Sequence, residues 1–176
     1  TLQAHCRIII FNGLLSMSGI VQRYGGKLVN TMVGSAAEAQ TLMATCHCEL
    51  ELTERQLCDV ELLMTGAFSP LDGFMTEAEY QSVVDTSHLP GPDGLLFGLP
   101  VVFDTNDEAL TVGRRVLLKH RHVPIAVLDV TSRYTPNKAA EAQACYGSTS
   151  IVHPAVSVLA SERGRIYCGG PVTGIA

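Results

Sequence analysis

The stretch LTERQLCDVELLMTGAFSPLDGFM, residues 52–75, decides the fold of this chain. Thr53 and Gln56 have the spacing of a capping box, in which two side chains satisfy the free amide groups of a helix start. Apolar residues then recur at helical spacing, which predicts one buried face. This apolar face consists of Leu57, Val60 and Met64. Because Gly66 can adopt the left-handed conformation that closes a helix, we predict that the helix ends there.

The second part of the stretch, FSPLDGFM at 68–75, predicts a chain reversal between two helices. Pro70 fixes its φ angle, and we expect Gly73 to supply a positive φ. Three apolar side chains of the turn are expected to pack into the core, namely Phe68, Leu71 and Phe74. Ser69 has no neighbouring base, so we expect it to have no catalytic role.

Shorter elements follow from caps, prolines and alternating patterns. Two further capping boxes predict helices after Ser35, with Glu38, and after Thr76, with Glu79. Two more helices are predicted to begin at Pro136 and Pro154 and to run to Gly147 and Gly164. The predicted strands are 28–33, 99–103, 115–119, 125–130 and 165–168. Strands that follow one another across turns favour antiparallel pairing, so we predict an α+β fold with a small barrel or curled sheet.

The composition indicates one globular domain without a bias towards polyanions. The 176 residues include 47% hydrophobic and 16% charged residues, which favours a folded chain over a disordered one. Because the formal net charge is -5, binding to nucleic acid or to an anionic membrane would require a local basic patch. The longest apolar run, 8–21, is shorter than a membrane-spanning helix requires. The six cysteines are interpreted as reduced thiols in the cytosol.

Candidate metal sites are incomplete. Cys46, His47 and Cys48 could begin a zinc site, but no second pair of ligands follows at zinc-site spacing. His120 and His122 would share one face of a strand, yet no carboxylate or cysteine is near them in the sequence. We therefore predict no metal site in this chain.

Other candidate sites are weaker still. Gly25, Gly26 and Lys27 lack the remaining residues of a phosphate loop and are interpreted as a turn. The basic segment 114–122 could hold phosphates or sulfate, but its alternation with apolar residues favours a solvated strand edge. The members of this segment that carry the charge are Arg114, Arg115, Lys119, His120, Arg121 and His122. Asp59 and Glu61 point in different directions on their helix and are interpreted as surface charges.

The segment 52–80 resembles a contiguous signature of sulfate adenylyltransferases (ATP sulfurylases), in which a capped helix precedes a Phe-Ser-Pro-Leu-x-Gly-Phe-Met turn. The resemblance continues at YGGKLVN 24–30, GLPVVFD 98–104, PIAVLDVTSRYTPNKAAEA 124–142, HPAV 153–156 and YCGG 167–170. The sequence departs from the family at SRYTPNK, 132–138, where the family often has Asp-Ile-Tyr-Arg-Pro-Asp-Lys.

This resemblance implies an amino-terminal PUA-like domain at 23–176, a small β-barrel with flanking helices, preceded by an unassigned lead-in at 1–22. The family's motifs Gln-x-Arg-Asn-Pro, His-x-x-His and Gly-Arg-Asp do not occur in the chain. No catalytic, cofactor-binding or metal-binding residue is therefore assigned. ATP and Mg²⁺ are expected only in the catalytic domain of the parent enzyme, and the chain alone, as a fragment or truncated product, is expected to be inactive.

The expected partner is the catalytic domain of the same enzyme, which joins ATP and sulfate, in a parent that forms a homo-oligomer. We expect no membrane association, at most weak and salt-sensitive RNA binding, and a cytoplasmic location with the plastid as the alternative. Two other functions stay open: an independent PUA-type RNA-binding module that uses segment 114–122, and a remnant that regulates a separate catalytic chain.

Overall fold

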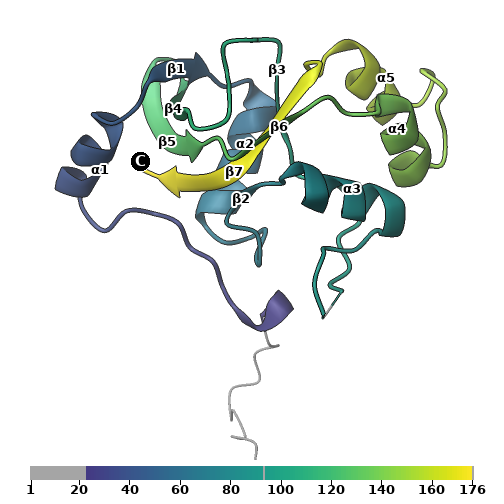
Figure 1. Ribbon diagram of the computed structural model, residues 1–176, viewed down its shortest axis with the longest axis horizontal. Coiled ribbons are helices and arrows are strands. Elements are labelled where there is room, and N and C mark those ends of the chain that lie inside the picture. Colours follow the sequence, from purple (N-terminus) through teal and green to yellow (C-terminus); the bar gives the residue numbers. More distant parts are fainter. Residues whose placement is uncertain (1–22, 93, 176) are drawn as a thin grey trace, which may run out of the picture.

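One long strand, β7 (Ile166–Gly174), organises the sheet, because four other strands pair with it. The computed structural model describes residues 23–92 and 94–175, so the lead-in predicted at 1–22 lies outside the described residues (Figure 1). The elements before β7 are η1 (Tyr24–Gly26), α1 (Ala36–Met43), β1 (Cys48–Glu51), α2 (Glu54–Met64), β2 (Gly73–Phe74), α3 (Glu77–Thr86), β3 (Phe103–Thr105), β4 (Arg115–His120), β5 (Val123–Asp129), β6 (Ser132–Tyr134), α4 (Lys138–Tyr146) and α5 (Pro154–Ser161).

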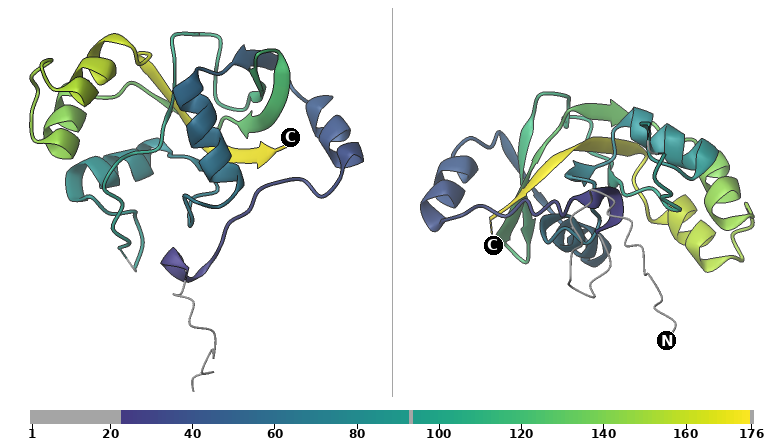
Figure 2. Two further views of the ribbon diagram at one scale, coloured as in Figure 1. Left: turned by 180° about the vertical axis from the view of Figure 1, so that it is seen from behind. Right: turned by 90° about the horizontal axis from the view of Figure 1, so that it is seen from below.

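The seven strands form one curled sheet in the order β1-β4-β5-β7-β2, with β3 and β6 paired to the first part of β7. Helix α2 lies against one face of this sheet, whereas α3, α4 and α5 gather at one end of it (Figure 2). The predicted α+β class is confirmed. The predicted small barrel is wrong, because among the described strands none joins β1 to β2 at the two ends of the strand order. These two strands have only four and two residues.

Antiparallel pairing holds for most of the sheet, but β1 pairs with β4 in parallel. The sequence patterns also missed β1, β2 and β6. Segment 28–33 was predicted as a strand and contributes only a bridge from Met32 to Gly174. Segment 99–103 was also predicted as a strand, but β3 begins at its last residue, Phe103.

The capping boxes at the starts of α2 and α3 are confirmed. Thr53 and Gln56 exchange hydrogen bonds of 3.0 and 3.2 Å between side chain and backbone. The box at Ser35 is incomplete, because the Glu38 carboxylate accepts a hydrogen bond from the amide of Gly34 instead.

The two proline-started helices have different outcomes. Helix α5 begins at Pro154 as predicted but ends at Ser161, before Gly164. Helix α4 begins two residues after Pro136, because the Asn137 side chain accepts a hydrogen bond from the amide of Ala140 and caps it there.

The FSPLDGFM turn packs into the core as predicted. Phe74 is 2% exposed, and its ring centroid lies 5.4 Å from that of Phe103. Ser69 has a structural role that the sequence did not suggest. Its hydroxyl donates to the carbonyl of Gly66 at 2.5 Å and accepts from the amide of Val29 at 2.9 Å. Ser69 therefore links the backbone at Val29 to the backbone that follows α2.

Gly73 serves a different purpose from the one predicted. Its φ is not positive; it lets β2 approach β7 closely, because a Cβ atom at Gly73 would lie 2.0 Å from the carbonyl oxygen of Gly170. Gly170 has φ +147°, and a Cβ there would lie 1.9 Å from the carbonyl oxygen of Asp129. These glycines let β7 continue through Gly169, Gly170 and Pro171, well past the predicted end at Cys168.

We predict that Gly73→Ala lowers the free energy of unfolding by about 3 kcal/mol or more, because backbone atoms on both strands must move apart. Urea denaturation followed by circular dichroism measures the change. Gly98→Ala is the matched control, since a Cβ there meets nothing within 4 Å. Equal stability of the two variants would contradict the close approach of β2 and β7.

Candidate functional site

A cleft of about 610 Å³ lies between α2, α4 and the segment 96–101. One wall is apolar, and three large side chains on its rim are strongly exposed. Tyr24 is 49%, Leu96 61% and Leu99 52% exposed. The other wall carries charged groups from two helices and the approach to β7. These groups are Arg55, Asp59, Glu141 and Arg163.

Arg55 joins two carboxylates on the α2 side of the cleft. It forms ion pairs with Asp59, at 3.1 Å, and with Asp104 of β3. Asp104 is 7% exposed and is held further by the amide of Gly164, which donates to Oδ2 at 2.6 Å. Gln56 Nε2 donates to the backbone carbonyl of Asp104 at 2.8 Å. The Arg55 guanidinium therefore has little capacity left for an external anion.

Glu141 of α4 is 1% exposed and lies behind the cleft wall. Its Oε2 accepts hydrogen bonds from the hydroxyls of Tyr80 and Tyr167, at 3.0 and 3.2 Å. Its Oε1 pairs with Arg163 Nη1 at 3.3 Å. Burial raises the pKa of Glu141, and the Arg163 guanidinium acts in the opposite direction. The sequence had assigned no role to Glu141 or Arg163.

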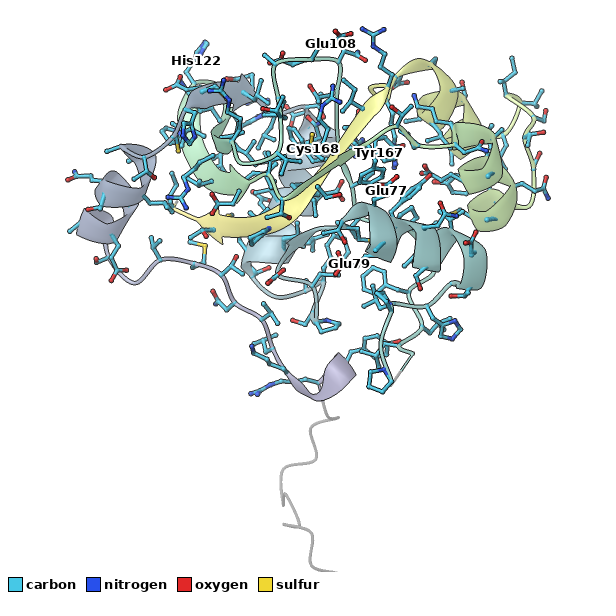
Figure 3. The ribbon with its side chains drawn as sticks, viewed as in Figure 1. Glu77, Glu79, Glu108, His122, Tyr167 and Cys168 are labelled. Carbon is cyan, nitrogen blue, oxygen red and sulfur yellow. The ribbon has the colours of Figure 1, made fainter. Side chains whose placement is uncertain are left out.

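Tyr80, Tyr134 and Tyr167 form a buried aromatic cluster beside this carboxylate. Their ring centroids lie 5.2 to 5.8 Å apart. Tyr167 projects from the middle of the molecule, on β7 (Figure 3). The hydroxyl of Tyr134 donates to the carbonyl of Met75 at 3.0 Å, so each of the three hydroxyls has an acceptor. Burial raises the pKa of all three tyrosines far above its ordinary value.

The cleft has no reactive nucleophile among its lining residues, and Cys145 of α4 is a poor candidate nearby. Burial raises the pKa of Cys145, and the Glu141 charge raises it further, so the thiolate is disfavoured. Asp59 was predicted to be a surface charge, and this is wrong. Its side chain is 24% exposed and lines the cleft, and burial raises its pKa although Arg55 and Arg163 lower it.

The cysteine and histidine residues singled out in the sequence have structural contacts. His47 Nδ1 lies 2.9 Å from the amide of Arg115, and burial raises the pKa of Cys46 and Cys48. Within residues 23–92 and 94–175, no group of three or more metal-ligating side chains is found. The absence of a metal site stays a prediction.

The other thiols and the two histidines at the β4–β5 turn add no site. Five cysteines in the described ranges are free thiols, and Cys6 lies outside these ranges. His120 Nδ1 lies 3.3 Å from the carbonyl of Leu52, and His122 sits at the turn, away from Tyr167 (Figure 3). Gly25 and Gly26 both have positive φ, as the predicted turn requires.

The basic segment 114–122 is largely neutralised by acidic partners. Arg115 forms a two-pronged ion pair with Asp129, with Nε to Oδ1 at 2.6 Å and Nη2 to Oδ2 at 3.1 Å. Lys119 pairs with Glu49 and Arg121 with Glu54, at 2.7 and 2.9 Å, and His120 Nε2 lies 3.5 Å from the Glu54 carboxylate. Leu117 alternates with the apolar residues Val116 and Leu118, a position that the predicted solvated edge would expose, but it is only 6% exposed. The strand is therefore covered on both faces at that point.

Comparison with known proteins defines the family of this arrangement. The sequence matches the PUA-like domain family over residues 21–176, which is most of its length. The chain belongs to the PUA-like domain family. Among the described residues, no helix is long and apolar enough to cross a membrane.

Relatives of this PUA-like chain include a protein from Schizosaccharomyces pombe named sulfate adenylyltransferase, which is 40% identical over 138 residues. A protein of the same name from Deinococcus radiodurans is 35% identical over 150 residues. The matches cover 75% and 85% of this chain but only 28% and 38% of the relatives' lengths. The chain thus corresponds to the PUA-like part of proteins named sulfate adenylyltransferase.

A solved structure from Thiobacillus denitrificans, described as a hexameric APS kinase, has the same fold. It superposes with a TM-score of 0.65 and 27% sequence identity. The superposition covers 89% of this chain and 27% of that one. The PUA-like fold therefore occurs there too as a minor part of a larger protein.

We predict that Glu141→Gln lowers the free energy of unfolding by about 3 to 5 kcal/mol, because it leaves the Arg163 charge buried without its partner. Thermal or urea unfolding measures the loss. Glu162→Gln is the control, since Glu162 is exposed and should change stability by less than about 0.5 kcal/mol. A Glu141→Gln variant with an unchanged free energy of unfolding would contradict the role given to this carboxylate.

We also predict that Tyr80, Tyr134 and Tyr167 ionise only when the protein unfolds in alkali. Because their folded-state pKa is raised, the neutral form contributes stability that is complete below about pH 10 and is lost at higher pH. Tyrosinate absorbance measures this directly, since the chain has no tryptophan. Ionisation of all five tyrosines before circular dichroism changes would contradict the cluster.

Proposed function

We propose that this chain is the accessory, non-catalytic domain of a sulfate adenylyltransferase. That enzyme forms adenosine 5′-phosphosulfate and pyrophosphate from ATP and sulfate. The observation that carries the proposal is the 40% identity with a relative of that name, of which the chain covers 28%. Residues 23–176 are taken as the PUA-like domain, and the catalytic region corresponds to the remaining length of the relatives.

The electrostatics of the cleft support a non-catalytic role. Adenylyl transfer from ATP needs preorganised positive charge around the phosphates, generally with Mg²⁺. In this chain Arg55 and Arg163 are both paired with carboxylates of the same chain. A triphosphate would therefore have to compete with these internal ion pairs, and we assign ATP and Mg²⁺ to the catalytic domain of the parent enzyme.

The pairing of the basic segment favours this proposal over the RNA-binding alternative. Phosphate binding depends on cations that are free to replace counterions. Arg115, Lys119 and Arg121 are each engaged with a carboxylate of the same chain. An RNA would have to compete with these internal ion pairs, so no observation favours RNA binding as a second function.

The proposed partner is the catalytic domain of the same polypeptide, in a parent enzyme that forms an oligomer. The hexameric description of the Thiobacillus denitrificans neighbour supports the oligomer. The free thiols of the described cysteines fit a reducing compartment, which we propose to be the cytoplasm, with the plastid as the alternative.

We predict that the isolated chain forms no adenosine 5′-phosphosulfate. The assay contains ATP, Mg²⁺, sulfate and a pyrophosphatase that draws the reaction forward. A chimera tests the proposal in the positive direction. In it, this chain replaces the matching 138 residues of the Schizosaccharomyces pombe protein. The control is the Schizosaccharomyces pombe protein from which those residues have been deleted and not replaced. The chimera should be active. Product from the isolated chain that survives repurification, or a well-folded but inactive chimera, would contradict the proposal.

A further inference from the structure

We propose that the cleft between α2 and α4 docks a basic side chain, carried on an apolar segment of the parent enzyme's catalytic region. This inference rests on the proposed function, because it names the surface by which the accessory domain meets that region. It is carried by two features of the cleft: one incompletely bonded carboxylate and an exposed apolar rim.

The charged groups of the cleft pair among themselves. Arg55 pairs with Asp59 and with the buried Asp104, and Arg163 pairs with Glu141. Lys138 Nζ donates to the carbonyl of Arg163 at 2.7 Å, so three cationic and three acidic side chains are gathered here. The preference of the cleft for a ligand therefore depends on which of these groups an incoming side chain can reach.

Asp59 is the carboxylate that a cation could reach. Asp104 and Glu141 are 7% and 1% exposed, and both of their oxygens accept hydrogen bonds. Asp59 is more open, and among the described residues only its Oδ2 accepts a hydrogen bond, from Arg55. Its Oδ1 therefore remains an open acceptor on a residue that lines the cleft.

The balance of forces on Asp59 also favours an incoming cation. Burial raises the pKa of Asp59, and Asp104 adds to this, whereas Arg55 and Arg163 lower it. The two arginines together do not offset the cost of burying the charge. A further cation against Oδ1 would supply the missing stabilisation.

The rim of the cleft favours a polypeptide segment over a small ligand. Leu96 and Leu99 are exposed by more than half, and Tyr24 by nearly half, on the border of the same cavity. The hydroxyl of Tyr24 donates to the carbonyl of Leu96 at 2.5 Å, which fixes the rim. Clustered exposed apolar residues around a cleft mark a surface that a partner covers.

A lysine or arginine fits this combination of walls. Its aliphatic stem can lie along Phe68 and Phe97, whose rings meet edge to face at 6.4 Å, while its charged head reaches Asp59. The chain spans only 28% and 38% of the two relatives described above, so most of each relative lies outside the match and can supply such a segment.

The charge preference is tested on the chain itself with benzamidine, a cationic aromatic probe, and benzamide, its neutral analogue. We expect NMR titration to show benzamidine shifting amides of α2, α4 and 96–101, with an affinity about tenfold above that of benzamide. Asp59→Asn should abolish the difference. Glu61→Gln, an exposed change on the same helix, should preserve it. Equal affinities, or shifts outside the cleft, would overturn the proposal.

The partner is tested in the chimera with the Schizosaccharomyces pombe protein, whose two parts should unfold in one thermal transition when docked. We expect Asp59→Lys and Leu99→Asp to separate this into two transitions, and Glu61→Lys and Val123→Asp to leave one. Val123 is 56% exposed and lies outside the cleft. A chimera that never assembles would contradict the proposed function. An assembled chimera unaffected by Asp59→Lys would contradict this inference alone.

Discussion

The buried carboxylate of Glu141 is the interaction on which the arrangement of helices and cleft depends. It connects α4 to Tyr80 of α3, to Tyr167 of β7 and to Arg163, which precedes β7. A buried charge is costly unless it is paired and hydrogen-bonded, and these three partners offset that cost. Because α4 forms one wall of the cleft, the same contacts set the position of that wall.

The second constraint is the close packing of backbones around β7. Gly73 and Gly170 admit neighbouring backbone atoms into space that a Cβ would occupy, so β2 and β5 can approach β7 from different sides. The sheet curls around this strand and leaves α2 on one face. The charged side of α2, with Arg55 and Asp59, consequently faces the segment 96–101 across the cleft.

Local signals in the sequence predicted local structure well. The capping boxes of α2 and α3 and the proline start of α5 depend on residues within one turn, and they were correct. Helix α4 was misplaced because Asn137 is a better cap than a proline two residues earlier. Strand β7 was cut short because a Gly-Gly-Pro run normally ends a strand, and only long-range packing shows why it continues.

The cleft could not be predicted, because its residues lie far apart in the sequence. The interpretation of Asp59 as a surface charge used only its angle to Glu61 on one helix. That interpretation could not take into account that segment 96–101, Glu141 and Arg163 line the same cleft as Asp59. The resemblance to sulfate adenylyltransferases located the family correctly but pointed to no residue of this site.

We propose above all that the cleft face of this domain is covered by the catalytic region of the proposed parent enzyme. Hydrogen–deuterium exchange, compared between the isolated chain and the chimera, tests it most directly. We expect slower exchange in the chimera at 96–101 and along α4, with little change at the ion-paired strand β4. Unchanged exchange at 96–101 and α4, with new protection over β4 and β5, would contradict it.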